Sequence, residues 1–232
     1  MNILSLDTCF DACSAAAGRG LRTLTPGIAF AFEPMQTGHA ERLLPMIATV
    51  MTEAGLEFRS LDRIALTYGP GTFTGTRISV SAARALALAT GAEFVALSSL
   101  RLMAMSAHIP AAPTRRIAIA TDARRGEVYF EVFDRHTMQT VVEAQCATIS
   151  AAAKLLGQEP IVIAGSGAEL LATEANREGA EATAILPDLL PDALDMLFPA
   201  CELPVSRTVK PLYLRAPDAK PPAPSPFIGA GA

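Results

Sequence analysis

The sequence predicts an α/β protein made of two stacked halves that face a cleft. Short apolar strands alternate with helical patterns up to about residue 107, which is the arrangement of a sheet covered by helices. After a proline-containing segment the same order of elements begins again. An apolar strand ending at Asp122, a turn and a second strand repeat the order found around Asp7. This repeated hairpin indicates that one unit has been duplicated.

The first half is predicted to hold one complete unit. Strands at residues 3–7, 13–17 and 27–32 precede a helix at about residues 39–54, whose apolar positions recur at helical spacing and which Gly55 ends. Pro45 should kink this helix or start a new turn. A strand at 64–68, a glycine-rich loop and an alanine-rich helix at about 76–90 follow. A strand at 94–97 and a helix that begins at Ser98 or Ser99 complete the half.

The loop at residues 108–115, with Pro110 and Pro113, is the predicted domain boundary. We therefore expect one lobe at 1–107 and a second at 108–215, with return of its last segment to the first lobe as an alternative. Strands at 117–121, 128–133 and 161–164 and helices at about 150–156 and after residue 167 are expected in the second lobe. Residues 216–232 are rich in proline and alanine and are expected to be disordered.

Composition disfavours several functional classes. The chain has 232 residues, a net charge of −4 and a pI near 5.4, whereas proteins that bind nucleic acid by themselves usually carry a basic balance. Its four cysteines contain no C-x-x-C pair and there are only three histidines, so no metal site is expected. No apolar run approaches the roughly 18 residues that span a membrane, and the N-terminus lacks the basic segment of a secretion signal. A cytoplasmic location is expected.

The glycine-rich loop at residues 69–75 follows a strand and opens a helix, which is where α/β proteins present amide groups to anions. It lacks the Gly-Lys-Ser/Thr end of a Walker A loop, and its glycines do not follow the G-x-G-x-x-G spacing. We therefore predict an architectural role, a joint that sets the next helix against the sheet. The residues of this structural loop are Gly69, Pro70, Gly71 and Gly75.

Five segments, at residues 3–8, 39–45, 69–78, 122–129 and 211–215, occur in an order that resembles the TsaB (YeaZ) family of bacterial tRNA threonylcarbamoyladenosine biosynthesis proteins. The resemblance is strong to about residue 107 and looser beyond it. It implies an α/β, two-lobed actin/Hsp70/sugar-kinase-like (ASKHA) fold with duplicated βββαβα-type halves. It also implies a non-catalytic subunit that binds and activates the TsaD transferase together with the TsaE ATPase, and that reaches tRNA only through this complex.

Features of the sequence disfavour a catalytic role. Relatives that are enzymes resemble this chain but carry a metal-binding His-x-x-x-His on the first helix, and here the matching pair is His39 and Leu43, which cannot share a metal. The turn at residues 8–11 has no glycine and ends in an acid, which is unfavourable for a triphosphate. Asp7 and Asp122 either form a carboxylate pair across the cleft or, the preferred interpretation, cap their own turns. No catalytic, cofactor-binding or metal-binding residue is predicted.

The two apolar helices favour a protein interface, because a sheet buries only one side of a helix. A glutamate in place of Leu44 or Ile47 should then abolish association and leave the chain folded.

Two alternatives to the interface remain. Both helices are buried within the chain, or the protein is an enzyme, either an ATP-dependent phosphotransferase or a glycoprotease-like hydrolase. Arg77, in the first turn of its helix, should pair with an external carboxylate or a loop acid. A homodimer through the same surface is a further alternative. The predicted interface comprises His39, Leu43, Leu44, Ile47, Met51, Arg77, Ile78, Ser81, Ala82 and Ala85.

Overall fold

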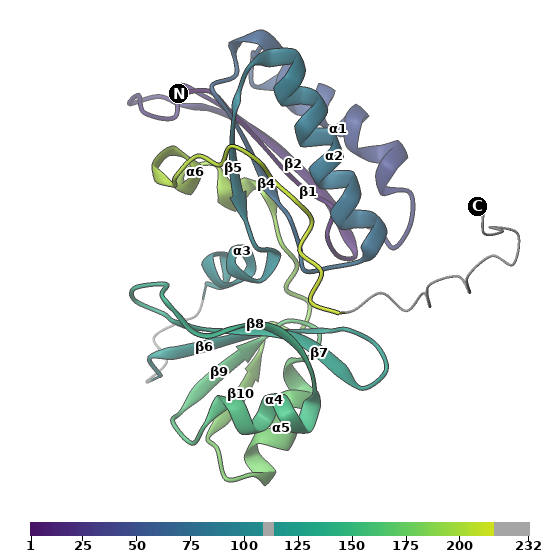
Figure 1. Ribbon diagram of the computed structural model, residues 1–232. Helices are drawn as coiled ribbons and strands as arrows, with labels where there is room; N and C mark the ends of the chain where they lie inside the picture. Colours follow the sequence, from purple (N-terminus) through teal and green to yellow (C-terminus); the bar gives the residue numbers. More distant parts are fainter. Residues whose placement is uncertain (109–113, 216–232) are drawn as a thin grey trace, which may run out of the picture.

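The computed structural model describes residues 1–108 and 114–215. It contains two five-stranded sheets, one in each of two lobes stacked along the long axis of the molecule (Figure 1). The expected disorder of residues 216–232 and part of the predicted 108–115 boundary lie outside the described residues.

The two sheets have the same topology. The first has the order β3-β2-β1-β4-β5 and the second has the order β8-β7-β6-β9-β10. In each, the first three strands form an antiparallel meander, the fourth strand pairs in parallel with the first, and the fifth pairs in parallel with the fourth. The predicted duplication is therefore confirmed. The strands are β1 Ile3–Asp7, β2 Ala12–Arg19, β3 Gly27–Pro34, β4 Arg63–Thr67, β5 Glu93–Leu97, β6 Arg116–Asp122, β7 Glu127–Asp134, β8 Thr140–Thr148, β9 Ile161–Ala164 and β10 Ala182–Ile185.

In each lobe, two helices pack on one face of the sheet through an apolar stripe at helical spacing. Helices α1 (His39–Glu53) and α2 (Phe73–Thr90) lie side by side on the first sheet. Helices α4 (Ile149–Leu156) and α5 (Ala168–Arg177) pack on the second. None of the helices in the described ranges is both long and apolar enough to cross a bilayer.

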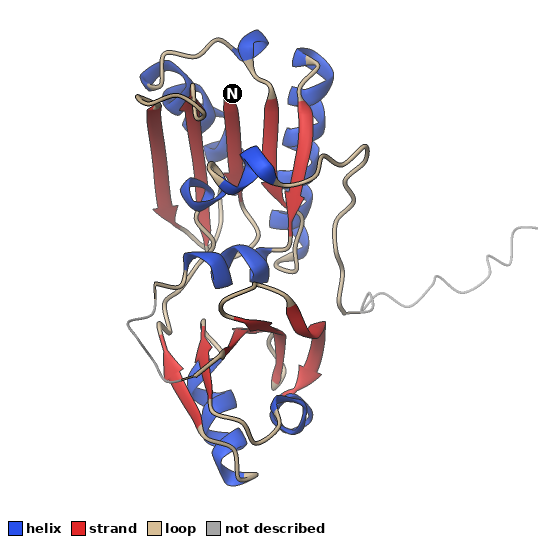
Figure 2. Cartoon of the chain, turned by 90° about the vertical axis from the view of Figure 1, so that its left-hand side faces the viewer, coloured by secondary structure: helices blue, strands red, loops and turns tan. Residues whose placement is uncertain are grey.

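Helix α3 (Ser99–Ser106) joins the lobes. It follows β5 of the first sheet and packs on β6 and β7 of the second (Figure 2). Apolar side chains from both lobes form one cluster at this place. Cys9 and Phe10, in the turn between β1 and β2, belong to this cluster. Part of the expected cleft is therefore filled by apolar side chains.

The chain returns to the first lobe after β10. The short helices η2 (Ala193–Met196) and α6 (Pro199–Glu202) cover the face of the first sheet opposite α1 and α2. Residues 206–215 then run along α2 toward the second lobe, with the amide of Leu212 donating to the carbonyl of Tyr68 at 2.7 Å. This C-terminal segment contacts both lobes, because Arg215 also forms an ion pair with Glu127.

Most predicted elements lie within three residues of their observed bounds, and five elements were not predicted. They are the strands β8 and β10 and the short helices η1 (Phe58–Ser60), η2 and α6, the last two within residues 193–202. Helix α2 begins at Phe73, three residues before its predicted start, because Thr72 caps it.

Candidate functional site

The glycine loop between β4 and α2 packs directly on the turn between β1 and β2. The amide of Thr72 donates to the carbonyl oxygen of Cys9 at 2.7 Å, and the hydroxyl of Thr8 donates to the carbonyl oxygen of Gly75 at 2.7 Å. The Oγ1 of Thr72 accepts from the amide of Gly75 at 3.0 Å and so caps α2. These polar groups bond to one another across the two segments, so they are not free to bind a ligand.

Close approach explains two of the glycines. A Cβ on Gly71 would lie 2.2 Å from the carbonyl oxygen of Cys9, and one on Gly75 would lie 1.9 Å from that of Thr8. Gly69 has a φ of 105°, a conformation that favours glycine. These contacts seat α2 against the sheet through the residues predicted to form a structural loop, Gly69, Pro70, Gly71 and Gly75.

The two aspartates that end β1 and β6 cap their own turns. Asp7 is fully buried; its Oδ1 accepts from the amide of Cys9 at 3.3 Å, and its Oδ2 accepts from the hydroxyl of Thr67. Asp122 is exposed, and its Oδ1 accepts from the amide of Arg124 at 2.8 Å. The turn-capping interpretation is confirmed for both aspartates.

The burial of Asp7 should make stability depend on pH. Burial raises the pKa of Asp7 to about 7, although hydrogen bonds from Thr67 and from the backbone of Cys9 oppose the shift. The folded chain then holds this proton more tightly than the unfolded chain. The free energy of unfolding should therefore fall as the pH rises from about 4 to about 7, and change little from this cause above pH 7.

The variant Asp7→Asn should reduce this dependence and be more stable than the wild type at pH 8, by up to about 4 kcal/mol. Urea unfolding of both proteins at pH 5, 6, 7 and 8 measures the difference. Asp188→Asn, at an exposed position, is the control and should keep the wild-type slope. Equal slopes for Asp7→Asn and the wild type would show that Asp7 is not the cause.

A cavity of about 850 Å³ lies between the lobes. It is bounded by the β1–β2 turn, the glycine loop, the β6–β7 turn and the C-terminal segment, and its surface is largely apolar. The hydroxyl oxygen of Thr121 is buried at this cavity and has no hydrogen-bond partner in the described structure. The polar residues that line the cavity include Asp11, Gln36, Asp122 and Ser166.

Four of the residues predicted for the interface lie inside the protein. Leu43, Ile47 and Met51 are each 1% exposed and belong to the core between α1 and the first sheet. His39 is 7% exposed, and its Nε2 donates to the carbonyl oxygen of Phe10 at 3.0 Å. These four side chains are not available to another protein. In residues 1–108 and 114–215 no three His, Cys, Asp or Glu side chains are placed to hold a metal ion.

The remaining predicted residues lie at or near the surface of α1 and α2. Leu44 is 57% exposed, and Arg77, Ser81 and Ala85 are exposed. Ile78 and Ala82 are half-buried and pack partly against the core. Leu88, one turn beyond Ala85, is 90% exposed and was missed, although its spacing from Ser81 and Ala85 places all three on one side of the helix. We define the outer face as Leu44, Ala48, Ser81, Ala85 and Leu88.

Arg77 has aromatic neighbours instead of the expected acid. Its guanidinium carbon lies 3.6 Å from the centre of the Phe73 ring, and its Nε donates to the hydroxyl oxygen of Tyr213 at 2.8 Å. The two rings are 5.5 Å apart. No loop acid pairs with Arg77 within the described residues, because the C-terminal segment, distant in sequence, brings Tyr213 to the start of α2. A carboxylate from a partner protein stays a prediction.

The four arginines that could suggest direct tRNA binding do not share a face. Arg115 and Arg116 lie at the start of β6, and Arg124 and Arg125 lie in the turn beyond its end, about 20 Å away for a strand of this length. Arg115 also pairs with Asp134, and Arg116 with Glu159. Their placement gives no single basic patch.

Comparison with known proteins connects this architecture to one tRNA modification. A family model described as TsaD, tRNA N6-adenosine threonylcarbamoyltransferase, matches residues 33–193. The tRNA threonylcarbamoyladenosine biosynthesis protein TsaB of Escherichia coli is 32% identical over 231 residues, covering 93% of this chain and 95% of that protein. The tRNA N6-adenosine threonylcarbamoyltransferase of Erythrobacter litoralis is 44% identical over 71 residues, covering 31% of this chain and 21% of the transferase.

A solved structure agrees with these sequence matches. YeaZ from Pseudomonas aeruginosa superposes with a TM-score of 0.74 at 29% sequence identity, and the match covers 92% of this chain and 99% of that one. The two-lobed α/β fold with duplicated halves that the sequence predicts is confirmed by this likeness and by the sheet order.

Proposed function

This chain belongs to the TsaB (YeaZ) family of tRNA threonylcarbamoyladenosine biosynthesis proteins, and we propose that it serves this biosynthesis as a non-catalytic subunit. In this proposal it binds and activates a TsaD-like transferase, with a TsaE-like ATPase in the same assembly. It works in the cytoplasm and reaches tRNA only through the complex. In the absence of the transferase, the same surface joins two copies of the chain.

The observation that carries the proposal is the outer face of α1 and α2. Leu44 and Leu88 project from neighbouring helices with 57% and 90% of their surfaces exposed, and alanine and serine lie between them. Large apolar side chains among small ones suit close packing against another helical surface. Because the inner faces of both helices already pack on the sheet, the outer face is left for a partner.

Two features support the absence of catalysis. The glycine loop bonds to the β1–β2 turn through the amide of Thr72 and the carbonyl of Gly75, so that amide is not available to a phosphate. The position that would complete a histidine pair on α1 is Leu43, which lies in the core. The large cavity between the lobes is the one observation that favours the alternative, an ATP-dependent phosphotransferase or a hydrolase of the same fold.

Reconstitution tests the proposal. The TsaD-like and TsaE-like proteins of the same organism are mixed with tRNA and threonylcarbamoyl-adenylate, with and without this chain, and the modified nucleoside is measured by mass spectrometry. We expect efficient modification only with the chain present, and co-elution of the chain with the transferase. A transferase that is fully active alone and never associates with the chain would contradict the proposal. ATP hydrolysis by the isolated chain would favour the enzyme alternative.

A further inference from the structure

A second cavity, of about 400 Å³, lies between the lobes beside the C-terminal segment. Tyr68 and Ser98 line it from the first lobe, where each directly follows a strand, β4 or β5. Glu131 on β7 and Glu143 on β8 line it from the second lobe. The cavity thus lies at the carboxyl ends of parallel strands, the edge at which open α/β sheets bind ligands.

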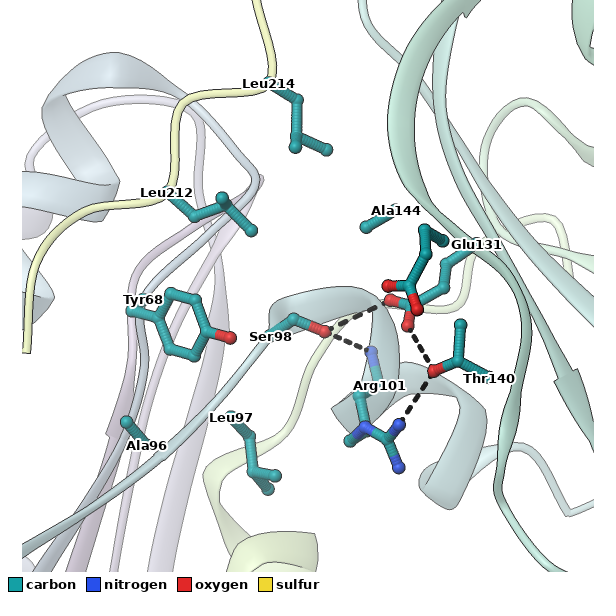
Figure 3. A pocket seen from close by; sticks show the side chains of 11 residues that line it. Tyr68, Ala96, Leu97, Ser98, Arg101, Glu131, Thr140, Ala144, Leu212 and Leu214 are labelled. Carbon is teal, nitrogen blue, oxygen red and sulfur yellow. Dashed lines mark hydrogen bonds between the residues drawn. The ribbon is translucent and has the colours of Figure 1, made fainter. Parts of the chain in front are cut away.

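A buried carboxylate forms the inner wall of this cavity. Glu131 is only 5% exposed; its carboxylate accepts from the hydroxyl of Thr140 at 3.0 Å and from that of Ser98 at 3.4 Å (Figure 3). Burial raises the pKa of Glu131, and the negative charge of Glu143 raises it further, against the effect of these hydrogen bonds and of Arg101. The hydrogen bonds and the charge of Arg101 therefore do not fully offset the cost of burying the Glu131 carboxylate.

The nearest cation, Arg101, does not neutralise this wall by contact. Its guanidinium donates to the carbonyl oxygen of Met138 at 2.8 Å and to Oγ1 of Thr140 at 3.0 Å, and it lies 5.2 Å from the centre of the Phe133 ring. Within the part of the chain that the structure describes, it forms no ion pair with Glu131. A cation that entered the cavity would therefore meet a carboxylate that accepts hydrogen bonds from two hydroxyl groups but forms no ion pair within the described residues.

The other groups that line the cavity indicate the chemistry of a suitable ligand. The hydroxyl of Tyr68 points into the cavity, and no hydrogen bond from it occurs in residues 1–108 and 114–215 (Figure 3). Two carboxylates and a phenol oxygen offer acceptors for the three N–H donors of an ammonium group. The rest of the wall is apolar and suits a short aliphatic chain; it comprises Ala96, Leu97, Ala144, Leu212 and Leu214.

We propose that this cavity binds a primary ammonium group carried on a short aliphatic chain, with Glu131 and Glu143 as its counter-ions and Tyr68 as a further acceptor. A free alkylamine and the lysine side chain of a partner protein both carry this group. The proposal goes beyond the role in tRNA modification and does not depend on it, because binding can be measured on the chain alone.

Calorimetric titration of the full chain with n-butylammonium and with n-butanol, which has the same chain length without the charge, tests the proposal. The ammonium should bind at one saturable site, and the alcohol at least tenfold more weakly. Glu131→Gln should weaken ammonium binding about tenfold or more, since it removes a charged hydrogen-bond acceptor. Glu143→Gln, at an exposed position that tolerates change, should weaken it severalfold. Glu169→Gln, exposed on α5, should leave it unchanged.

Repeating the titration on the complex with the transferase identifies the source of the group. If the complex no longer binds n-butylammonium and Glu143→Gln weakens assembly, a lysine of the partner occupies the cavity. If the complex binds n-butylammonium as the free chain does, the natural ligand is a free amine. The proposal would be overturned if n-butylammonium and n-butanol bound equally well. It would also be overturned if Glu131→Gln and Glu143→Gln both bound n-butylammonium as tightly as the wild type, even where the complex assembles normally.

Discussion

Replacing Leu44 with glutamate is expected to abolish association with the TsaD-like subunit and to leave the chain folded. The side chain is 57% exposed on the outer face, so a charge there is hydrated in the free chain and must be stripped of water in a complex. Affinity should fall at least a hundredfold, the loss expected when an interface anchor becomes a buried charge without a partner. Pull-down and analytical gel filtration with the transferase measure association, and thermal unfolding measures the fold.

Three variants control this result. Leu88→Glu, on the same face, should also prevent association. Leu170→Glu, at a 60% exposed leucine on α5, should not, because α5 covers the other lobe. Leu43→Glu, one residue from Leu44 but 1% exposed, should unfold the chain. If Leu44→Glu and Leu88→Glu both bind like the wild type, the interface lies elsewhere and the proposed function loses its main support.

The contrast between Leu43 and Leu44 shows what the sequence could predict about this surface. Helical spacing identified α1 and its apolar stripe, and the structure places that stripe on the first sheet. The prediction assigned the stripe to a partner, yet the most regular apolar positions of a helix pack within its own chain. For the same reason, Ile47→Glu, first expected to leave a folded protein, should instead unfold it. The large apolar residues that stay exposed, and that we propose for a partner, are those that break the pattern, such as Leu44 and Leu88.

The glycine loop shows a second limit. Its glycines and the strand before it indicated a sharp turn, and its spacing differs from that of phosphate-binding motifs. The contact of Gly75 with Thr8 joins residues far apart in sequence, and no local pattern reveals such a pairing. The aromatic partner of Arg77 was missed for the same reason, because Tyr213 reaches it only through the return of the chain to the first lobe.

Replacing Gly75 with alanine is expected to destabilise the protein by about 2–4 kcal/mol. The new Cβ would lie 1.9 Å from the carbonyl oxygen of Thr8 and 2.7 Å from Oγ1 of Thr72. The first of these atoms belongs to the backbone of the β1–β2 turn, so relief requires α2 and the turn to move apart. That movement would break the hydrogen bond from the Thr8 hydroxyl to the carbonyl of residue 75. Urea unfolding at one pH measures the loss of free energy.

Gly27→Ala is the matched control, because the nearest atoms to its new Cβ are the guanidinium nitrogens of Arg19 at 3.2 and 3.3 Å, the end of a flexible side chain. Its effect should stay within about 0.5 kcal/mol. Since α2 also carries Ser81, Ala85 and Leu88, Gly75→Ala should weaken association with the transferase even where the chain remains folded. A variant as stable as the wild type would show that α2 is not seated by this contact. A stable variant that lost only association would instead place the loop itself in the interface.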